Sequence, residues 1–118
     1  MYTVIPTDKF SKDVEYYVKK KKFKHIGNDI GKIVTALEGG HLLGDDIPGF
    51  QHDFNGQAYK VRAANTDTHV GKSNGYRIIY YAIRDDLEIY LLTIYYKKED
   101  NRIPSNNDII DIIEMYCL

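Results

Sequence analysis

The apolar positions near the start of the chain follow the period of a helix. A short strand-like run at Tyr2–Pro6 is followed by apolar side chains at spacings of i, i+4, i+7 and i+8, counted from Phe10. That spacing lines one face of an α-helix. Thr7 or Asp8 is suited to cap the N-terminus of this helix, and the lysines at residues 19–22 suit its C-terminal end. The pattern predicts a strand followed by an amphipathic helix.

A second apolar stripe, Ile26–Leu37, follows at once. Asn28 or Asp29 is expected to start this helix. Gly39-Gly40 is expected to end it, because glycine readily takes the left-handed conformation found just past helix ends. The two stripes together predict a helical hairpin. Residues 40–56 are rich in Gly, Asp and His, and they predict an irregular connection.

The period then changes to that of β-strands. Ala58–Ala64 is a short mixed run, and a polar loop at residues 65–75 separates it from Tyr76–Ile83, which is rich in β-branched and aromatic residues. The short turn Arg84–Asp86 joins this strand to Glu88–Tyr96, so the two predict an antiparallel hairpin. Both strands are nearly continuous in apolar residues, which indicates that both of their faces are covered.

The last apolar stripe begins after Pro104-Ser105 and predicts a C-terminal helix. The predicted order is β-α-α-β-β-β-α, an α+β fold in which the N-terminal helical hairpin packs on a small antiparallel sheet. The chain has 118 residues and neither internal repeats nor a linker, so residues 1–118 are expected to form a single domain.

Composition narrows the class of protein. The chain is 43% hydrophobic with a formal net charge of −1, which argues against disorder. No stretch has the pattern of a membrane span or a secretory signal, so no membrane partner is expected. Cys117 is the only cysteine and cannot form an intramolecular disulfide, which fits a reducing, cytoplasmic compartment. Basic blocks at residues 1–24 and 60–102 alternate with acidic blocks, so a local polyanion site is compatible with the near-neutral total.

Basic side chains gather in the predicted strands and their loops. Lys60 and Arg62 are two residues apart on one strand, so they leave the same face. Lys72 lies in the polar loop before the next strand, and Lys97 and Lys98 end the strand after that. If these strands are neighbours, the cations converge at one end of the sheet, where a polyphosphate or a nucleic-acid backbone is the natural partner. The alternative is that each is a solvated strand end or guards a sheet edge.

Arg77 is the most informative of the cations. It precedes a run of apolar and aromatic residues in a strand expected to be buried, where a charge needs a partner. Asp67 and Glu88 are candidates for a structural partner. A bound phosphate is the functional alternative, because the planar guanidinium matches phosphate geometry. The four histidines have no metal-ligand spacing.

Three blocks of this region resemble the RelE-type toxins of bacterial type II toxin–antitoxin systems. The blocks read Tyr59-Lys-Val-Arg62, Gly71-Lys-Ser-Asn-Gly-Tyr-Arg-Ile-Ile-Tyr-Tyr81 and Tyr90-Leu-Leu-Thr-Ile-Tyr-Tyr-Lys-Lys-Glu99. They are most similar to the HigB-like branch of that family. The predicted helices on either side agree with the family in order and length, so the resemblance spans nearly the whole chain and implies a RelE-like fold.

The resemblance also implies a function. Such a toxin is a small ribonuclease that cleaves mRNA on the ribosome and is held inactive by a cognate antitoxin protein. The family's chemistry uses no metal and no cofactor. The ribose 2′-hydroxyl attacks the adjacent phosphate, the 5′-oxygen leaves, and a 2′,3′-cyclic phosphate remains. The protein must supply a proton acceptor, cations for the transition state and a proton donor.

Carried over by position, the resemblance assigns catalysis to four residues. Lys60 and Arg62 fall on the family's pair of basic residues, with Lys60 the candidate base. A lysine serves as a base only where burial or neighbouring cations favour its neutral form. Arg77 falls on the phosphate-binding arginine, and Lys98 on a basic residue used near the leaving group.

RNA or phosphate binding is assigned to four further residues. Lys72 and Lys97 match lysines of the HigB-like branch. The best-known RelE toxins also carry a tyrosine after the last strand, which stacks on a base. This chain has no tyrosine at the corresponding place near Pro104, and Tyr95 and Tyr96 are the candidates to replace it.

Two other interpretations stay open. The family is usually basic, whereas this chain has a net charge of −1. A toxin of the same fold can act by binding alone, as ParE-type relatives inhibit DNA gyrase, and a degenerate toxin can persist as an antitoxin-bound co-repressor. The chain could also be an unrelated small α+β binding domain.

Overall fold

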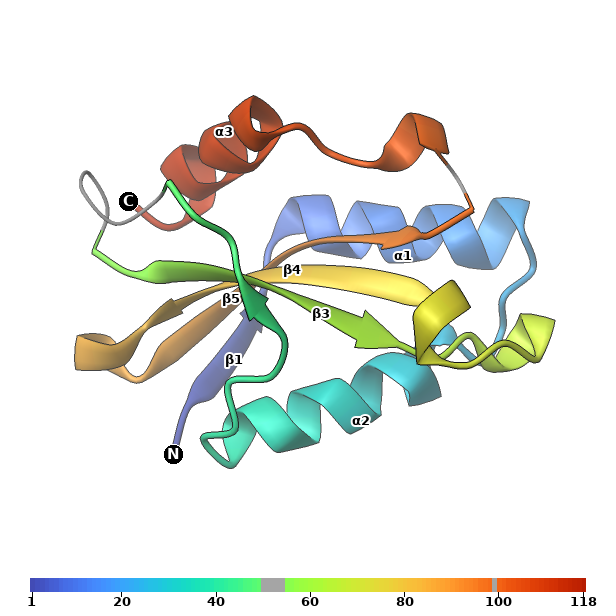
Figure 1. Cartoon of the computed structure of the whole chain (residues 1–118), viewed down its shortest axis with the longest axis horizontal. Coiled ribbons are helices and arrows are strands. Elements are labelled where there is room, and N and C mark those ends of the chain that lie inside the picture. The colour runs from blue at the N-terminus through green and yellow to red at the C-terminus, as the bar shows by residue number, and fades with distance from the viewer. Residues whose placement is uncertain (50–54, 99) are drawn as a thin grey trace.

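The computed structural model describes residues 1–49, 55–98 and 100–118, which build a five-stranded sheet with helices on both faces (Figure 1). The helices and strands are, in chain order, β1 (Thr3–Pro6), α1 (Asp8–Lys20), α2 (Ile26–Glu38), β2 (Asp45–Asp46), β3 (Gln57–Ala63), β4 (Tyr76–Ile83), β5 (Glu88–Tyr96) and α3 (Asn106–Tyr116). Short 3₁₀ turns lie between β3 and β4, between β4 and β5, and before α3. The predicted order of elements is confirmed, with one addition. The two-residue β2 lies in the stretch that was expected to be irregular.

The strand order in the sheet is β1-β5-β4-β3-β2. The β3–β4 and β4–β5 pairs are antiparallel, as predicted, and the unpredicted β2 also pairs with β3 in antiparallel, but β1 pairs with β5 in parallel. The expectation of a purely antiparallel sheet is therefore wrong. Backbone bonds from Thr3 to Leu87 and from Thr7 to Leu91 hold the parallel pair. These partners are more than eighty residues apart, and so distant a pairing leaves no trace in a local hydrophobic pattern.

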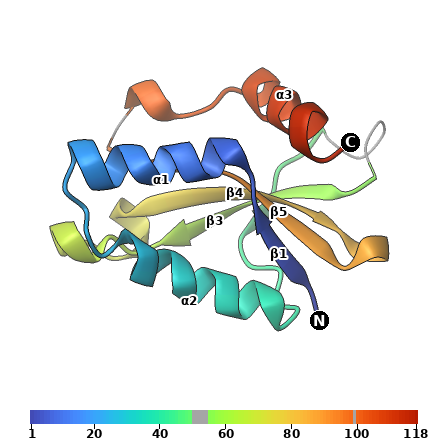
Figure 2. The same ribbon diagram turned by 180° about the vertical axis from the view of Figure 1, so that it is seen from behind.

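Helices cover both faces of the sheet. α1 and α2 lie across one face, in front in Figure 2, and α3 lies across part of the other face, as Figure 1 shows. Tyr17, Leu37 and Tyr80 are fully buried beneath α1 and α2, while Ile79 packs with Ile113 beneath α3. Each such side chain contributes roughly 1.5–3 kcal/mol by leaving water. The prediction that both faces of the long strands are covered is confirmed.

The starts of the first two helices have different causes. The Thr7 hydroxyl accepts a hydrogen bond from the Phe10 N–H at 3.2 Å, so Thr7 is the N-cap of α1. Thr7 is one of the two residues predicted for this position. α2 begins at Ile26, earlier than predicted, and has no side-chain cap. The backbone N–H of His25 instead donates to Asp67 at 2.9 Å. A tertiary contact, rather than a local cap, therefore fixes where α2 starts.

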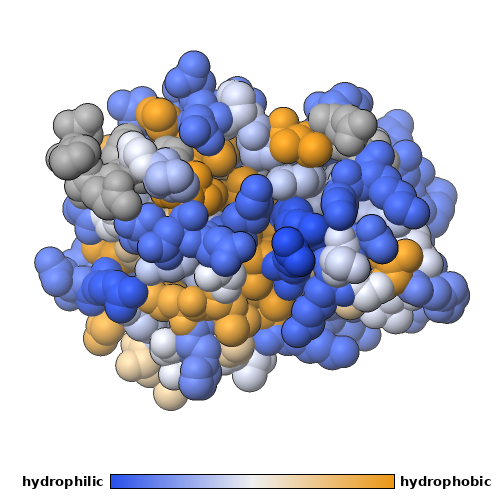
Figure 3. All heavy atoms as spheres, viewed as in Figure 1, coloured by the Kyte–Doolittle hydropathy of each residue, from blue (hydrophilic) through white to orange (hydrophobic). Residues whose placement is uncertain are grey.

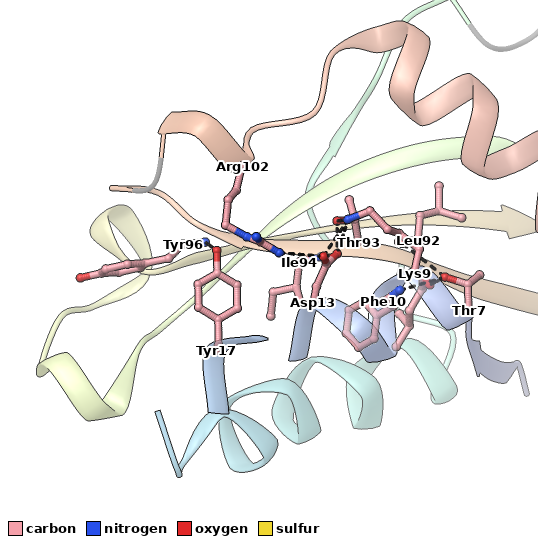
Figure 4. Close-up of polar contacts among 11 residues, drawn as sticks. Thr7, Lys9, Phe10, Asp13, Tyr17, Leu92, Thr93, Ile94, Tyr96 and Arg102 are labelled. Atoms are coloured by element: carbon pink, nitrogen blue, oxygen red, sulfur yellow. Dashed lines mark hydrogen bonds and ion pairs between the residues drawn. The ribbon is translucent and has the colours of Figure 1, made fainter. Parts of the chain in front are cut away.

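A buried carboxylate joins α1 to β5 and to the segment before α3 (Figure 4). Asp13 is 3% exposed. It accepts hydrogen bonds from Lys9 Nζ at 2.7 and 2.8 Å, from Arg102 Nη2 at 3.1 Å and from the Thr93 hydroxyl. The Arg102 guanidinium also lies over the Tyr16 ring, 3.7 Å from its centroid. This network anchors the chain between β5 and α3 against the sheet.

Candidate functional site

α3 leaves one end of its sheet face uncovered, and basic side chains gather there. Arg62 lies directly across from Arg77 in the β3–β4 pair, and Arg77 directly across from Tyr95 in the β4–β5 pair. Lys60 is two residues before Arg62 on β3 and so leaves the same face. These four residues, with Asp45, Lys97 and Ile103, line a hollow of about 390 Å³, which we call the basic hollow. Figure 3 shows this face of the molecule, with hydrophilic surface to the right of its centre.

The Arg77 side chain is held by backbone carbonyls. It is 8% exposed. Its Nη1 donates to the oxygens of Lys72 at 3.1 Å and Tyr76 at 3.2 Å, and its Nη2 donates to the oxygen of Ser73 at 3.0 Å. The 3₁₀ turn between β3 and β4 therefore fixes the plane of the guanidinium, and it does so without neutralising its charge.

The two carboxylates proposed as structural partners of Arg77 lie elsewhere. Asp67 accepts from His25, whose ring nitrogen is 2.7 Å from the carboxylate. Burial raises the pKa of Asp67, but the hydrogen bonds and the charge of His25 outweigh burial and leave that pKa lowered. Glu88 accepts from the Tyr90 hydroxyl at 3.2 Å. Of the two alternatives for Arg77, a structural partner at Asp67 or Glu88 is therefore not found, because the fold turns both carboxylates toward other groups.

The electrostatics of the basic hollow favour an anion. Burial lowers the pKa of Arg77, and the facing charge of Arg62 lowers it further. Like charges directly across a strand pair repel each other. In the described part of the chain, the hydrogen bonds of Arg77 include no carboxylate that would offset this repulsion. A phosphate placed between the two guanidiniums would supply the missing charge.

Two lysines extend the positive surface. Lys97 Nζ donates to the oxygen of Ser73 at 3.0 Å, which brings it to the same turn that holds Arg77. Lys72 lines a second hollow of about 410 Å³, which shares Asp45, Lys60 and Arg62 with the basic hollow. Five of the basic residues singled out in the sequence therefore surround two adjoining hollows.

The two tyrosines expected to contact RNA point to opposite faces of the sheet. Tyr95 is 5% exposed and lines the basic hollow beside Arg77. Burial raises the pKa of its hydroxyl, so the ring stays neutral. Tyr96 packs on the α1 side, with its ring centroid 5.6 Å from that of Phe23 and its hydroxyl bonded to Thr68 at 3.3 Å. Tyr96 is thus a core residue, and its interpretation as an RNA-binding residue is not supported, because successive strand residues face opposite sides.

The lining of the basic hollow also differs from the prediction at three other positions. Lys98 is exposed in the turn after β5 and does not line the hollow. Asp45 and Ile103 do line it and were not predicted. Asp45 lies directly across from Lys60 in the β2–β3 pair, and the segment that carries Ile103 is anchored by the Asp13 network. Neither placement has a local signal in the sequence.

No three His, Cys, Asp or Glu side chains lie close enough to hold a metal ion in residues 1–49, 55–98 and 100–118. None of the helices in those residues has both the length and the apolar character that crossing a membrane requires. Comparison of the chain with known protein families and with curated proteins gave no match.

Proposed function

We propose that this chain is the toxin of a type II toxin–antitoxin system, with a RelE-like fold and the activity of a ribosome-dependent mRNA endonuclease. The observation that carries the proposal is the meeting of Lys60, Arg62 and Arg77 in one open hollow. These are three of the four residues that the resemblance to RelE-type toxins assigns to catalysis. The partners in this proposal are the ribosome, its mRNA and a cognate antitoxin protein.

The geometry of Arg77 supports phosphate binding. A guanidinium carries five N–H donors. Three of those of Arg77 bond to backbone oxygens, two from Nη1 and one from Nη2. Within the described residues this leaves the Nε–H and one Nη2–H for a ligand. Two donors of one guanidinium match two oxygens of a phosphate.

The hollow also suits the transition state of the cleavage. As the 2′-oxygen bonds to phosphorus, the phosphorus becomes five-coordinate and its oxygens gain negative charge. Arg62 and Arg77 lie directly across from each other and both line the hollow, and the backbone holds Arg77 in place before the reaction begins. Donors that are already oriented stabilise developing charge at little cost in reorganisation. The ribosome would hold the mRNA in line for attack.

Expression of the chain alone in bacteria tests the proposal. The wild-type chain is expected to arrest growth and to produce cuts within translated codons, mapped by primer extension. Arg77→Lys keeps the positive charge but loses the planar guanidinium, so it is expected to abolish both effects. Lys20→Ala, at the exposed end of α1, is the matched control and is expected to behave as wild type.

The thermal midpoints of the purified variants separate function from folding. Arg77→Lys is expected to unfold within a few degrees of wild type, because the lysine ammonium is also a donor and can bond to the same backbone oxygens. If Arg77→Lys instead fails to fold, Arg77 is a structural residue of the β3–β4 turn. If folded wild-type chain makes no cuts, the nuclease assignment is wrong.

A second candidate is a toxin or co-repressor of the same fold that acts only by binding. The placement of two residues favours it. Lys98 lies outside the basic hollow, and Tyr96 is buried on the other face, so the roles of leaving-group cation and base-stacking tyrosine are unfilled at those positions. Growth arrest with intact mRNA would indicate a binding toxin such as a gyrase inhibitor. Soluble chain that causes neither arrest nor cuts would indicate a co-repressor.

A further inference from the structure

We propose that Asp45 is the proton acceptor of the cleavage and that Lys60, directly across from it, is the proton donor. This inference rests on the nuclease function proposed above and reverses the role that the resemblance implies for Lys60. It adds to the site a residue that the sequence did not single out.

Asp45 is placed by the sheet at the rim of the basic hollow. It pairs with Lys60 across β2 and β3, and it lines both adjoining hollows. Directly opposed residues of an antiparallel pair have their Cβ atoms about 4.5–5.5 Å apart, so the two side chains reach the same space. Asp46, the next residue on β2, faces the other side of the sheet, where its charge acts on Tyr80.

The segment that carries Asp45 is held firmly. The hydroxyl of the fully buried Tyr80 donates to the Leu43 oxygen, and the Ile47 N–H donates to the Ala58 oxygen at 2.9 Å. Between these two anchors, β2 approaches β3 so closely that a Cβ at residue 44 would lie 2.3 Å from a backbone oxygen, and glycine stands there with φ +91°. The backbone that carries Asp45 is therefore held at this place beside β3.

The donor and acceptor chemistry of the hollow selects Asp45 for proton acceptance. Arginine and the lysine ammonium are donors only, whereas an ionised carboxylate is an acceptor only. Among the described residues that line the basic hollow, Asp45 supplies the one carboxylate. The same ammonium that makes Lys60 unsuited to accept a proton suits it to donate one.

The proposed step conserves atoms and charge. Asp45 takes the proton of the 2′-hydroxyl as the 2′-oxygen forms its bond to phosphorus. The bond from phosphorus to the 5′-oxygen breaks, and the 5′-oxygen takes a proton from the Lys60 ammonium. The products are a 2′,3′-cyclic phosphate and a 5′-hydroxyl. Transfer of the proton from Asp45 to Lys60, directly or through water, restores the starting state.

Single-turnover cleavage of a ribosome-bound mRNA tests the acceptor. Asp45→Asn keeps the shape of the side chain and removes its basicity, so cleavage is expected to fall by about 10²–10⁴-fold. Binding is measured with the same mRNA carrying a 2′-deoxyribose at the cut site. Asp45→Asn is expected to bind it as tightly as wild type or more tightly, because a negative charge has left a phosphate site. Asp46→Asn, on the other face of β2, is the matched control.

A leaving group that needs no proton tests the donor. An mRNA with sulfur in place of the 5′-oxygen at the cut site is expected to restore cleavage by Lys60→Ala and to leave Asp45→Asn inactive. Rescue of Asp45→Asn by this substrate would overturn the assignment. Faster cleavage by Asp45→Asn, or loss of binding together with cleavage, would also overturn it. If wild type itself does not cut, the proposed function fails. If wild type and Asp45→Asn cut equally, only this inference fails.

Discussion

Asp13→Asn is expected to lower the free energy of unfolding by about 3 kcal/mol. The Asp13 carboxylate is 3% exposed and accepts hydrogen bonds from the cations of Lys9 and Arg102 and from the Thr93 hydroxyl (Figure 4). Asparagine has nearly the same shape, but its amide nitrogen would face one of these donors and could not accept from it.

The magnitude follows from how much of each partner remains in water. Removing one member of a buried ion pair costs about 3–5 kcal/mol when the charge left behind stays buried. The side chains of Lys9 and Arg102 are 43% and 25% exposed, so they recover part of their hydration. The cost therefore lies at the lower end of that range. In a chain of 118 residues it corresponds to a fall in Tm of about 12 °C.

Urea unfolding followed by far-ultraviolet circular dichroism measures this cost, with fluorescence of the 11 tyrosines as a second probe. Glu15→Gln is the control on the same helix. It breaks an ion pair with Lys19 whose side chains are 64% and 69% exposed, and such a pair contributes no more than about 0.5 kcal/mol. If Asp13→Asn costs no more than Glu15→Gln, the buried network does not stabilise the fold and the reasoning is refuted.

Three further predictions concern other parts of the chain. Gly75→Ala places a Cβ 2.2 Å from a backbone oxygen, so it should displace the turn that holds the Arg77 guanidinium, lower the Tm and abolish the growth arrest proposed for this chain. Gly71→Ala places a Cβ that meets nothing within 4 Å, so it should have none of these effects. Equal effects of the two substitutions would contradict the role given to the close backbone contact at Gly75. Burial raises the pKa of the Cys117 thiol to about 12, so a thiol reagent at mildly alkaline pH should label the folded chain far more slowly than the chain in urea. Asp67 has a lowered pKa, because the hydrogen bonds and charge of His25 outweigh the effect of burial. The ionised Asp67 carboxylate stabilises the fold fully at pH values above the ordinary pKa of an aspartate. This contribution is lost as the pH falls through the lowered pKa of Asp67. An acid titration of Tm should therefore be steeper for wild type than for Asp67→Asn.

The secondary structure was predictable wherever its cause lies within a few residues. The strands Tyr76–Ile83 and Glu88–Tyr96 appear with the predicted bounds, because runs of β-branched and aromatic residues interrupted by a polar turn favour a hairpin over any other local structure. The Ser105 cap of α3 likewise acts on an N–H only three residues away, that of Asp108.

The basic hollow was predictable in part. Alternation along β3 places Lys60 and Arg62 on one face. Arg77 stands out in the sequence because it is a charged residue in an otherwise apolar strand. The same alternation puts Tyr95 and Tyr96 on opposite faces but does not say which face is open. Which face is open depends on how much of the sheet α3 covers. No local sequence pattern encodes the extent of that cover.

By itself, the sequence determined the type and order of the helices and long strands, because propensity, periodicity and capping act between near neighbours. Only the tertiary structure decided the parallel pairing of β1 with β5, the burial of Asp13 between three segments, and the placement of Asp45 opposite Lys60. Each of these depends on segments far apart in the chain. Their contacts form only when the packing of the whole sheet and its helices outweighs the entropy lost in closing the long loops between them.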